Sequence, residues 1–383
     1  MKKIILILWI FASHSSFSQK SNFSISGKIK GLDTKYISLF IYDADLPRGF
    51  SQDSIPVKNG SFSYTASVSK FLYAAISPMM SQVVKTSGTG FYPAKSSMFQ
   101  FFIAPGYKLK FNGEIKDFVD AYPSGEKNNN GFAKLCRVIY PMLNKSLNLT
   151  VTIAKKEVTD LDVVKRMKDT IQVLDKKVIE LKTQFIRDNP SSGAAAWLLS
   201  DMMIRSQVSN AVATEMFNGL DKEKLSNIVY YSEAAKRVEG FSATATGKIV
   251  PEISTKNTYS GNQFTLSALR GRYVVLDFWG TWCGPCIAGM PKMKEYLEKY
   301  SGKMEIVGVA SESDKGERWK KFLDGKPQYQ WHHVLSTKDQ DYILQFSVAG
   351  FPTKMIIDPE GKIVGRYVGE DDVIYRKLDE LMK

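Results

Sequence analysis

Residues 274–286 read VVLDFWGTWCGPC, an apolar stretch that ends in two cysteines separated by two residues. The β-branched and aromatic residues before the cysteines predict a buried strand. Gly284 and Pro285 predict that a helix begins between the cysteines, because proline is tolerated in the first helical turn, where its missing N–H costs nothing. This part of the chain is therefore constrained to a strand–turn–helix unit with Cys283 at the helix N-terminus.

The position of Cys283 at a helix N-terminus predicts a reactive thiol. Unpaired backbone N–H groups and the positive end of the helix dipole favour the thiolate, which is the nucleophile of thiol-disulfide exchange. Cys286 lies nearly one turn further on and can attack a mixed disulfide formed on Cys283. We therefore predict a redox-active Cys283–Cys286 disulfide, with Cys283 as the nucleophile and Cys286 as the more buried resolving cysteine.

A metal site and a structural disulfide are the alternatives for this pair. A structural zinc site needs four ligands, usually from a second Cys-x-x-Cys or from spaced histidines. The histidines beyond residue 18 are the adjacent His332 and His333, whose side chains point to opposite faces of a strand. We therefore predict no metal and no cofactor. A structural disulfide stays open, although the tiny loop that it closes restricts the unfolded chain little.

Two further residues each have a structural and a functional interpretation. Asp277 stands in the apolar strand before the cysteines. If it is buried, its pKa rises, and it could accept the proton of Cys286; a carboxylate on the solvent face is the alternative. Cys136 lies in the apolar stretch GFAKLCRVIY and is interpreted as a buried thiol, with a regulatory or intermolecular disulfide as the alternative.

The N-terminus has the layout of a cleavable signal peptide over residues 1–18. Lys2 and Lys3 precede an apolar run of about nine residues, which is shorter than the ~20 that span a bilayer. The small and polar stretch SHSSFSQ follows, and it predicts cleavage before Gln19. An uncleaved N-terminal anchor is the alternative. No cysteine lies near the cleavage site, which argues against a lipid anchor, so we expect a periplasmic protein that is soluble after cleavage.

The basic charge does not indicate nucleic-acid binding. The formal net charge of +13 falls by two, to +11, when Lys2 and Lys3 are removed with the signal peptide. The remaining basic residues are interleaved with acidic ones, and no recognition motif accompanies them. A solvated helix surface that is attracted to anionic membranes is the better interpretation.

The chain has three zones, in keeping with a length of 383 residues. Residues 19–120 alternate between apolar and polar, which predicts an all-β, sandwich-like domain. Residues 121–244 have helical periodicity, with one helix that ends before Asn189-Pro190 and another from an Asp221 cap to Gly240. Residues 245–383 alternate between strand-like and helical runs, which predicts an α/β sheet with helices on its faces.

Several motifs resemble known families. DFWGTWCGPC, with Pro291 eight residues after Cys283, is similar to the active-site strand, turn and kinked helix of thioredoxin, where Asp277 is also the usual choice. GFPTKMIIDPEGKIV (350–364) resembles the cis-proline segment of that family. IVGVASES and FTLSALRGRYVVLDFW are more similar to the exported TlpA/ResA-like branch. FSISGKIKGL, NGSFSY and FFIAPGYKLKFNG resemble the DUF4369 domain that is fused to such thioredoxin domains in Bacteroidetes.

The resemblance implies a thioredoxin fold at the C-terminus and a role in cell redox homeostasis. It implies a cis peptide bond before Pro352, facing the cysteines, and a backbone at Phe351 that pairs with an extended substrate peptide. Trp282 and Phe351 could form the apolar rim of the substrate groove; packing against the domain's own helices is the alternative. The substrate-binding residues would be Trp282, Gly284, Pro285, Gly350, Phe351 and Pro352.

We predict an exported thiol-disulfide oxidoreductase that reduces protein disulfides. Its partners would be thiol or disulfide clients and, since the periplasm is oxidising, a membrane electron donor. A homodimer through the N-terminal or helical region is also considered. The acidic residues of ResA-type haem-protein maturation are replaced by Gly284 and Gly289, which argues against that role. The alternatives are an envelope binding protein with a structural disulfide and a thiol peroxidase, although the chain has no Thr-x-x-Cys motif.

Overall fold

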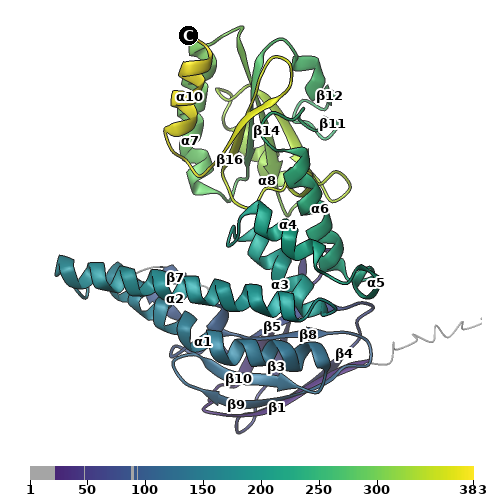
Figure 1. The fold of residues 1–383 in the computed structure, drawn as a ribbon, viewed down its shortest axis with the longest axis vertical. Helices are drawn as coiled ribbons and strands as arrows, with labels where there is room; N and C mark the ends of the chain where they lie inside the picture. The colour runs from purple at the N-terminus through teal and green to yellow at the C-terminus, as the bar shows by residue number, and fades with distance from the viewer. Residues whose placement is uncertain (1–21, 47, 88–89, 93) are drawn as a thin grey trace, which may run out of the picture.

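The computed structural model describes residues 22–46, 48–87, 90–92 and 94–383. The predicted signal peptide, residues 1–18, lies outside the described residues. Figure 1 shows a strand-rich part at the N-terminus, a group of helices in the middle and a sheet flanked by helices at the C-terminus. This order matches the expected fold class, which is a thioredoxin-fold domain preceded by a strand-rich domain and a helical segment.

The N-terminal part is a sandwich of two four-stranded sheets, with strand orders β10-β9-β1-β4 and β3-β2-β5-β8. Its inward-facing side chains, among them Ile25, Leu39 and Phe101, share one core. Alternating apolar residues favour this arrangement, because every second side chain of a strand points to the same face. The strands are β1 (Phe23–Lys30), β2 (Tyr36–Tyr42), β3 (Phe50–Pro56), β4 (Ser61–Ala66), β5 (Leu72–Ser77), β8 (Phe99–Ile103), β9 (Lys108–Ile115), β10 (Val119–Ser124) and the small pair β6 (Lys85–Ser87) and β7 (Gly90–Tyr92).

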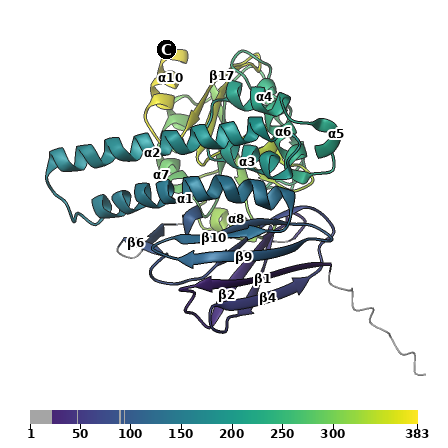
Figure 2. The same ribbon diagram turned by 60° about the horizontal axis from the view of Figure 1, so that its bottom comes forward.

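Strand β5 departs from alternation because helices cover its second face. All its residues are buried. Tyr73 points away from the sandwich core and stacks on Trp197, with ring centroids 4.2 Å apart. The helices are α1 (Lys127–Ala154), α2 (Leu161–Asp188), α3 (Gly193–Ile204), α4 (Asn210–Asn218), α5 (Lys222–Leu225) and α6 (Val229–Ala243). In Figure 2, α1 and α2 lie side by side and extend beyond the sandwich.

Two sequence-based boundaries need correction. Strand β10 continues to Ser124, so the boundary expected at residue 120 falls inside a strand. The helix expected from Asp221 to Gly240 is two helices. Asp221 caps only the four-residue α5, and the extended backbone of Ile228 (φ −92°, ψ 119°) separates α5 from α6. Helix α6 then continues through Gly240, where the close approach of the Gln345 carbonyl requires a residue without a side chain. Helix α2 ends at Asp188, as its periodicity predicts.

The C-terminal part is a five-stranded sheet in the order β15-β14-β13-β16-β17. Strands β13, β14 and β15 are parallel, and β16 pairs antiparallel with both β13 and β17. Val275 and Trp279 of β13 face helices α7 and α10, while Leu276 and Phe278 face the opposite core. The elements are β11 (Ser254–Thr255), β12 (Phe264–Thr265), β13 (Tyr273–Trp279), α7 (Gly284–Lys299), β14 (Met304–Ser311), α8 (Glu317–Asp324), β15 (His332–Ser336), α9 (Tyr342–Gln345), β16 (Thr353–Ile357), β17 (Ile363–Val368) and α10 (Val373–Leu381).

Across the described ranges, no helix combines the length and the apolar character that crossing a bilayer requires.

Candidate active site

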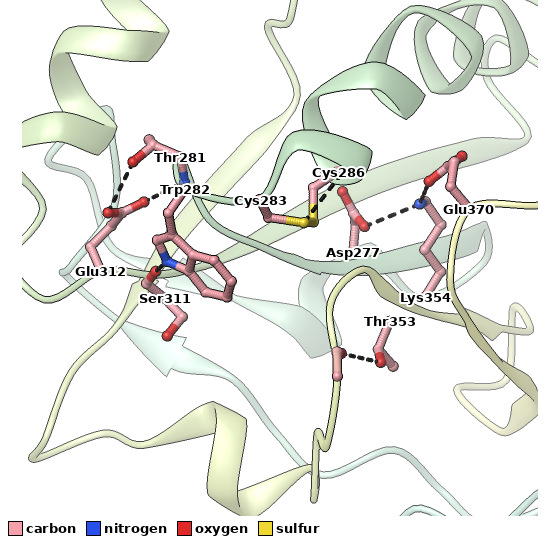
Figure 3. The surroundings of a disulfide bond; sticks show 11 residues. Asp277, Thr281, Trp282, Cys283, Cys286, Ser311, Glu312, Thr353, Lys354 and Glu370 are labelled. Carbon is pink, nitrogen blue, oxygen red and sulfur yellow. Dashed lines mark hydrogen bonds and ion pairs between the residues drawn. A yellow bond between two sulfur atoms is a disulfide. The ribbon is translucent and has the colours of Figure 1, made fainter. Parts of the chain in front are cut away.

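The two cysteines of the opening motif form a disulfide where β13 passes into α7 (Figure 3). Cys283 is the N-cap of α7, and its Sγ accepts a hydrogen bond from the backbone N–H of Cys286 at 3.2 Å. Pro285 occupies the first turn, where it does not remove an intrahelical hydrogen bond. Both cysteines are buried, and Cys283, at 5% exposed, is slightly more accessible than Cys286, at 1%.

An aromatic pair stands beside the disulfide. Trp282 is 56% exposed, and its ring meets Phe351 edge to face, with centroids 5.0 Å apart and an interplanar angle of 72°. The indole N–H of Trp282 donates to the carbonyl of Ser311 at 2.9 Å, which fixes the orientation of the ring. The Phe351–Pro352 peptide bond is cis, as the resemblance implied. More than half of the Trp282 surface is thus open to solvent, at an apolar edge that it forms with Phe351.

Gly350 closes the turn before Pro352. The hydroxyl of Thr353 donates to the Gly350 carbonyl at 2.7 Å, so the segment that leads into β16 is tied back on itself. A Cβ at Gly350 would touch only a Val368 methyl group, and nothing lies within 4 Å of the corresponding position at Gly284. Both glycines therefore leave the space around the disulfide and the cis-proline segment open.

Asp277 lies behind the disulfide and is buried, which excludes the solvent-face alternative. Its side chain is almost fully enclosed, and burial raises its pKa from 3.8 to about 6. The ammonium group of Lys354 lies 3.6 Å from Asp277 Oδ1 and acts against this rise, while the charge of Glu370 adds to it. A carboxyl group with a pKa near neutrality can accept and release a proton at physiological pH.

Glu312 holds the turn that carries the aromatic rim. Its Oε1 accepts from the backbone N–H of Thr281 at 2.6 Å, and its Oε2 accepts from the Thr281 hydroxyl at 3.1 Å. The segment before Cys283 is therefore fastened to the end of β14 by a charge-assisted contact and by the Trp282–Ser311 bond.

Glu312, Lys354 and Glu370 were not among the site residues expected from the sequence. Lys354 had a detectable signal, because a lysine inside the apolar run TKMII is unusual for a buried strand. Glu312 and Glu370 lie in loops, where acidic residues are common, and the sequence shows no sign of what they contact.

The other chemistry-bearing residues are not part of this site. Cys136 lies in the core between the sandwich and the helices, where burial raises the pKa of its thiol to about 12. The interpretation of Cys136 as a buried thiol agrees with this position. Burial also lowers the pKa of His333 to about 4, and its Nε2 contacts the Tyr329 carbonyl at 2.9 Å. The described part of the chain contains no group of three or more His, Cys, Asp or Glu side chains that could hold a metal ion.

Comparison with known proteins agrees with this geometry. The profile of the AhpC/TSA family matches residues 246–366. "Thiol-disulfide oxidoreductase ResA" from Bacillus anthracis is 33% identical over 178 residues, which cover 45% of this chain and 88% of that protein. The chain belongs to the ResA-type thiol-disulfide oxidoreductases. "Thioredoxin-like protein YneN" from Bacillus subtilis is 32% identical over 127 residues, which cover 32% of this chain and 71% of the relative.

The N-terminal part and the solved structures complete the comparison. The profile of the DUF4369 domain, a domain of unknown function, matches residues 23–132. Among solved structures, the thioredoxin domain of a thiol-disulfide oxidoreductase from Bacteroides vulgatus shares 30% identity, with coverage of 36% of this chain and 99% of that one and a TM-score of 0.33. A thiol:disulfide interchange protein DsbE from Chlorobium tepidum shares 27% identity, with coverage of 36% and 94% and a TM-score of 0.32. This oxidoreductase of the thioredoxin family therefore carries its enzyme domain at the C-terminus and a DUF4369 domain at the N-terminus.

Proposed function

We propose that the protein is exported and reduces the disulfides of client proteins, with Cys283 as the nucleophile and Cys286 as the resolving cysteine. The observation that carries this proposal is the order of groups at the N-terminus of α7. The outer sulfur caps the helix, the inner sulfur lies behind it, and a buried carboxyl group lies behind the inner sulfur (Figure 3). From the outer sulfur inward, the nucleophile, the resolving group and the base thus follow one another in the order in which the reaction uses them.

The reaction begins with the reduced pair. The Cys283 thiolate attacks one sulfur of a client disulfide, a new S–S bond joins client and enzyme, and the other client sulfur leaves as a thiolate that takes a proton from solvent. Cys286 then transfers its proton to Asp277 and attacks Cys283 Sγ. The Cys283–Cys286 bond forms, and the client sulfur leaves. Two electrons have passed from the enzyme to the client, and the enzyme is in the oxidised state that the structure shows.

The aromatic rim is an argument that the substrate is a protein and not a small thiol compound. Trp282 and Phe351 present apolar surface next to Cys283, and Glu312 keeps the turn beneath them in place. A client segment would lie across this edge, held by the Gly350–Pro352 backbone and by the open surface at Gly284 and Pro285. Large aromatic groups contribute most of the contact energy in such sites.

Location and partners belong to the same proposal. The layout of residues 1–18 supports export to the periplasm, where regeneration of the dithiol requires a membrane electron donor. The DUF4369 domain and helices α1–α6 would select the client or hold a homodimer. The mass of the mature protein tests the export step, since cleavage leaves Gln19 at the N-terminus.

Trapping of a mixed disulfide tests the chemistry directly. Cys286→Ser should accumulate a mixed disulfide between Cys283 and a test protein that contains a disulfide, because the resolving thiol is gone. Cys283→Ser should trap nothing, and Cys136→Ser should behave like the wild type. Equal trapping by both active-site variants would contradict the assignment of roles.

The reduction potential separates the remaining directions and alternatives. Equilibration of the couple with glutathione and dithiothreitol buffers should give a value near the thioredoxin potential of about −270 mV. A value near −120 mV would indicate an enzyme that installs disulfides. A couple that cannot be reduced would indicate a structural disulfide in a binding protein, and peroxide consumption that depends on Cys283 would indicate a thiol peroxidase.

A further inference from the structure

The proton that Asp277 accepts has no direct way out of the protein. Asp277 is 1% exposed, with the disulfide on one side of it and Lys354 on the other (Figure 3). Among the described residues, Asp277 Oδ1 has no hydrogen-bond partner. A buried base must lose its proton after each turnover, so the groups between Asp277 and solvent limit how well it can work.

Lys354 is the nearest ionisable group on that path. It stands directly opposite Asp277 in the antiparallel pairing of β13 and β16, so both side chains leave the sheet on the same face. It is 1% exposed, and its Nζ lies 3.6 Å from Asp277 Oδ1 and 2.5 Å from Glu370 Oε2. The buried ammonium group is attracted by both carboxylates and connects them.

Glu370 continues the path to the surface. Its side chain is 22% exposed, and its Oε1 accepts a hydrogen bond from the Tyr375 hydroxyl at 3.1 Å. The carboxyl group lies against α7 at Gly289, where a Cβ would come within 2.3 Å of Glu370 Cδ. Glycine inside a helix is destabilising relative to alanine. Its presence here makes room for this carboxyl group, two turns or less from the cysteines.

Given the roles proposed for Cys286 and Asp277, we infer that Lys354 and Glu370 form a relay that carries the proton of Asp277 to solvent. Lys354 donates a proton to Glu370 and accepts one from Asp277, so the lysine ends as an ammonium group, Asp277 ends ionised and Glu370 ends protonated. Glu370 then releases the proton to water. No electron moves and no other reactant is needed. Lys354 and Glu370 do not touch the reacting sulfur atoms, and both act only through Asp277.

The charges around Asp277 decide the direction of the pH effect. Lys354 of β16 lowers its pKa, and Glu370, after β17, raises it. From the other elements, α7 presents the cysteines, α10 presents the neutral hydroxyl of Tyr375, and β14 presents Gly308 in register. Removal of the Glu370 charge should therefore lower the pH at which Asp277 becomes a base, while it closes the exit for the proton.

A two-phase reaction separates this relay from the function on which it rests. The reduced protein is mixed with an aromatic disulfide that releases a coloured thiolate. The first release reports attack by Cys283, and the second reports attack by Cys286 on the mixed disulfide. A variant that lacks Cys283 and Cys286 measures the contribution of Cys136. Wild-type protein that gives no second release would contradict the proposed function itself, and the relay with it.

Two variants then test the relay by different means. Glu370→Gln keeps the shape and removes the acid, and Gly289→Ala pushes the carboxyl group from its place without changing any charge. In both, we expect the second phase to slow about tenfold at pH 5, where Asp277 begins protonated and must lose its proton before it can accept that of Cys286, while the first phase stays within twofold. In Glu370→Gln the midpoint of the pH profile of the second phase should also fall. Glu370→Asp should restore part of the rate of that phase.

The control is Asp372→Asn, which removes another carboxylate that pairs with α7, at Lys292, but does not face Asp277. It should leave both phases unchanged. The relay is wrong if Glu370→Gln and Gly289→Ala match this control, or if they slow both phases equally, which would indicate a structural role. Because Gly289→Ala favours the helix, it tests the relay even if Glu370→Gln folds poorly.

Discussion

Glu312, at the end of β14, accepts a hydrogen bond from the backbone N–H of Thr281 at 2.6 Å, and so ties the turn before Cys283 to the neighbouring strand. Hydrogen bonds to a charged group contribute about 1.5–3 kcal/mol. Glu312→Gln should loosen the Trp282 edge and raise KM for a protein client about threefold to tenfold, with kcat nearly unchanged. Steady-state kinetics with a protein disulfide measures this.

The matched control is Glu317→Gln, which changes an exposed carboxylate at the start of α8. It should leave both constants as they are. A fall in kcat with KM unchanged would show that Glu312 acts on the sulfurs and not on the client surface.

Asp277→Asn should stabilise the oxidised protein at alkaline pH although it slows the reaction. The folded state raises the pKa of Asp277 from 3.8 to about 6, so it binds a proton that the unfolded chain has released. Stability from this group is complete below pH 3.8 and is lost as the pH rises through about 6. The asparagine variant escapes this loss, so at pH 8 its free energy of unfolding should be higher by about 2–3 kcal/mol.

Chemical denaturation at pH 4 and pH 8 measures the effect, and the difference should nearly vanish at the lower pH. Asp379→Asn is the control of opposite sign, because the hydrogen bond from Lys299 lowers the pKa of Asp379 to about 2. That variant should bring no gain at pH 8. If Asp277→Asn is destabilising at both values, its contact with Lys354 outweighs the cost of burial.

Gly240→Ala should weaken the contact between the helical part and the thioredoxin domain. A Cβ there would lie 2.6 Å from the Gln345 carbonyl oxygen of α9, which belongs to the backbone and cannot turn aside. Overpacking of this kind costs about 1–3 kcal/mol, which exceeds the gain in helix propensity. Thermal unfolding should show a lower Tm, and protease should cut the segment after Ala243 more readily.

Gly219→Ala serves as the comparison, since its Cβ would meet only ordinary contacts, the nearest at 3.4 Å. It should leave the Tm unchanged or raise it. Equal effects of the two substitutions would mean that α6 and α9 can separate at no cost.

Cys136→Ser should lower stability without changing the redox couple. The hydroxyl would replace a thiol that is 2% exposed in an apolar core, and burial of a hydroxyl with poor partners costs about 1–3 kcal/mol. The potential of the Cys283–Cys286 couple should match that of the wild type. In the native protein an alkylating reagent should leave Cys136 unmodified, and rapid labelling would contradict the buried position.

Local pattern was enough to predict the reactive unit. The strand before the cysteines, the helix that begins at Gly284 and the order of the two sulfurs follow from side-chain types within a few residues of one another. The same holds for α2, whose end at Asp188 precedes Asn189-Pro190. These features depend on helix and strand preferences, which act between neighbours in the chain.

Only the tertiary structure decided what surrounds that unit. Asp277 meets Lys354 because β13 and β16 pair in one particular register, and Glu370 reaches them because α7 has a glycine where the carboxyl group lies. The break between α5 and α6 also has no local sequence signal strong enough to predict it. Strand order and register are set by the sum of many distant contacts. The sequence by itself therefore determined which sulfur atoms are proposed to react, and the fold determined which charged groups lie around them.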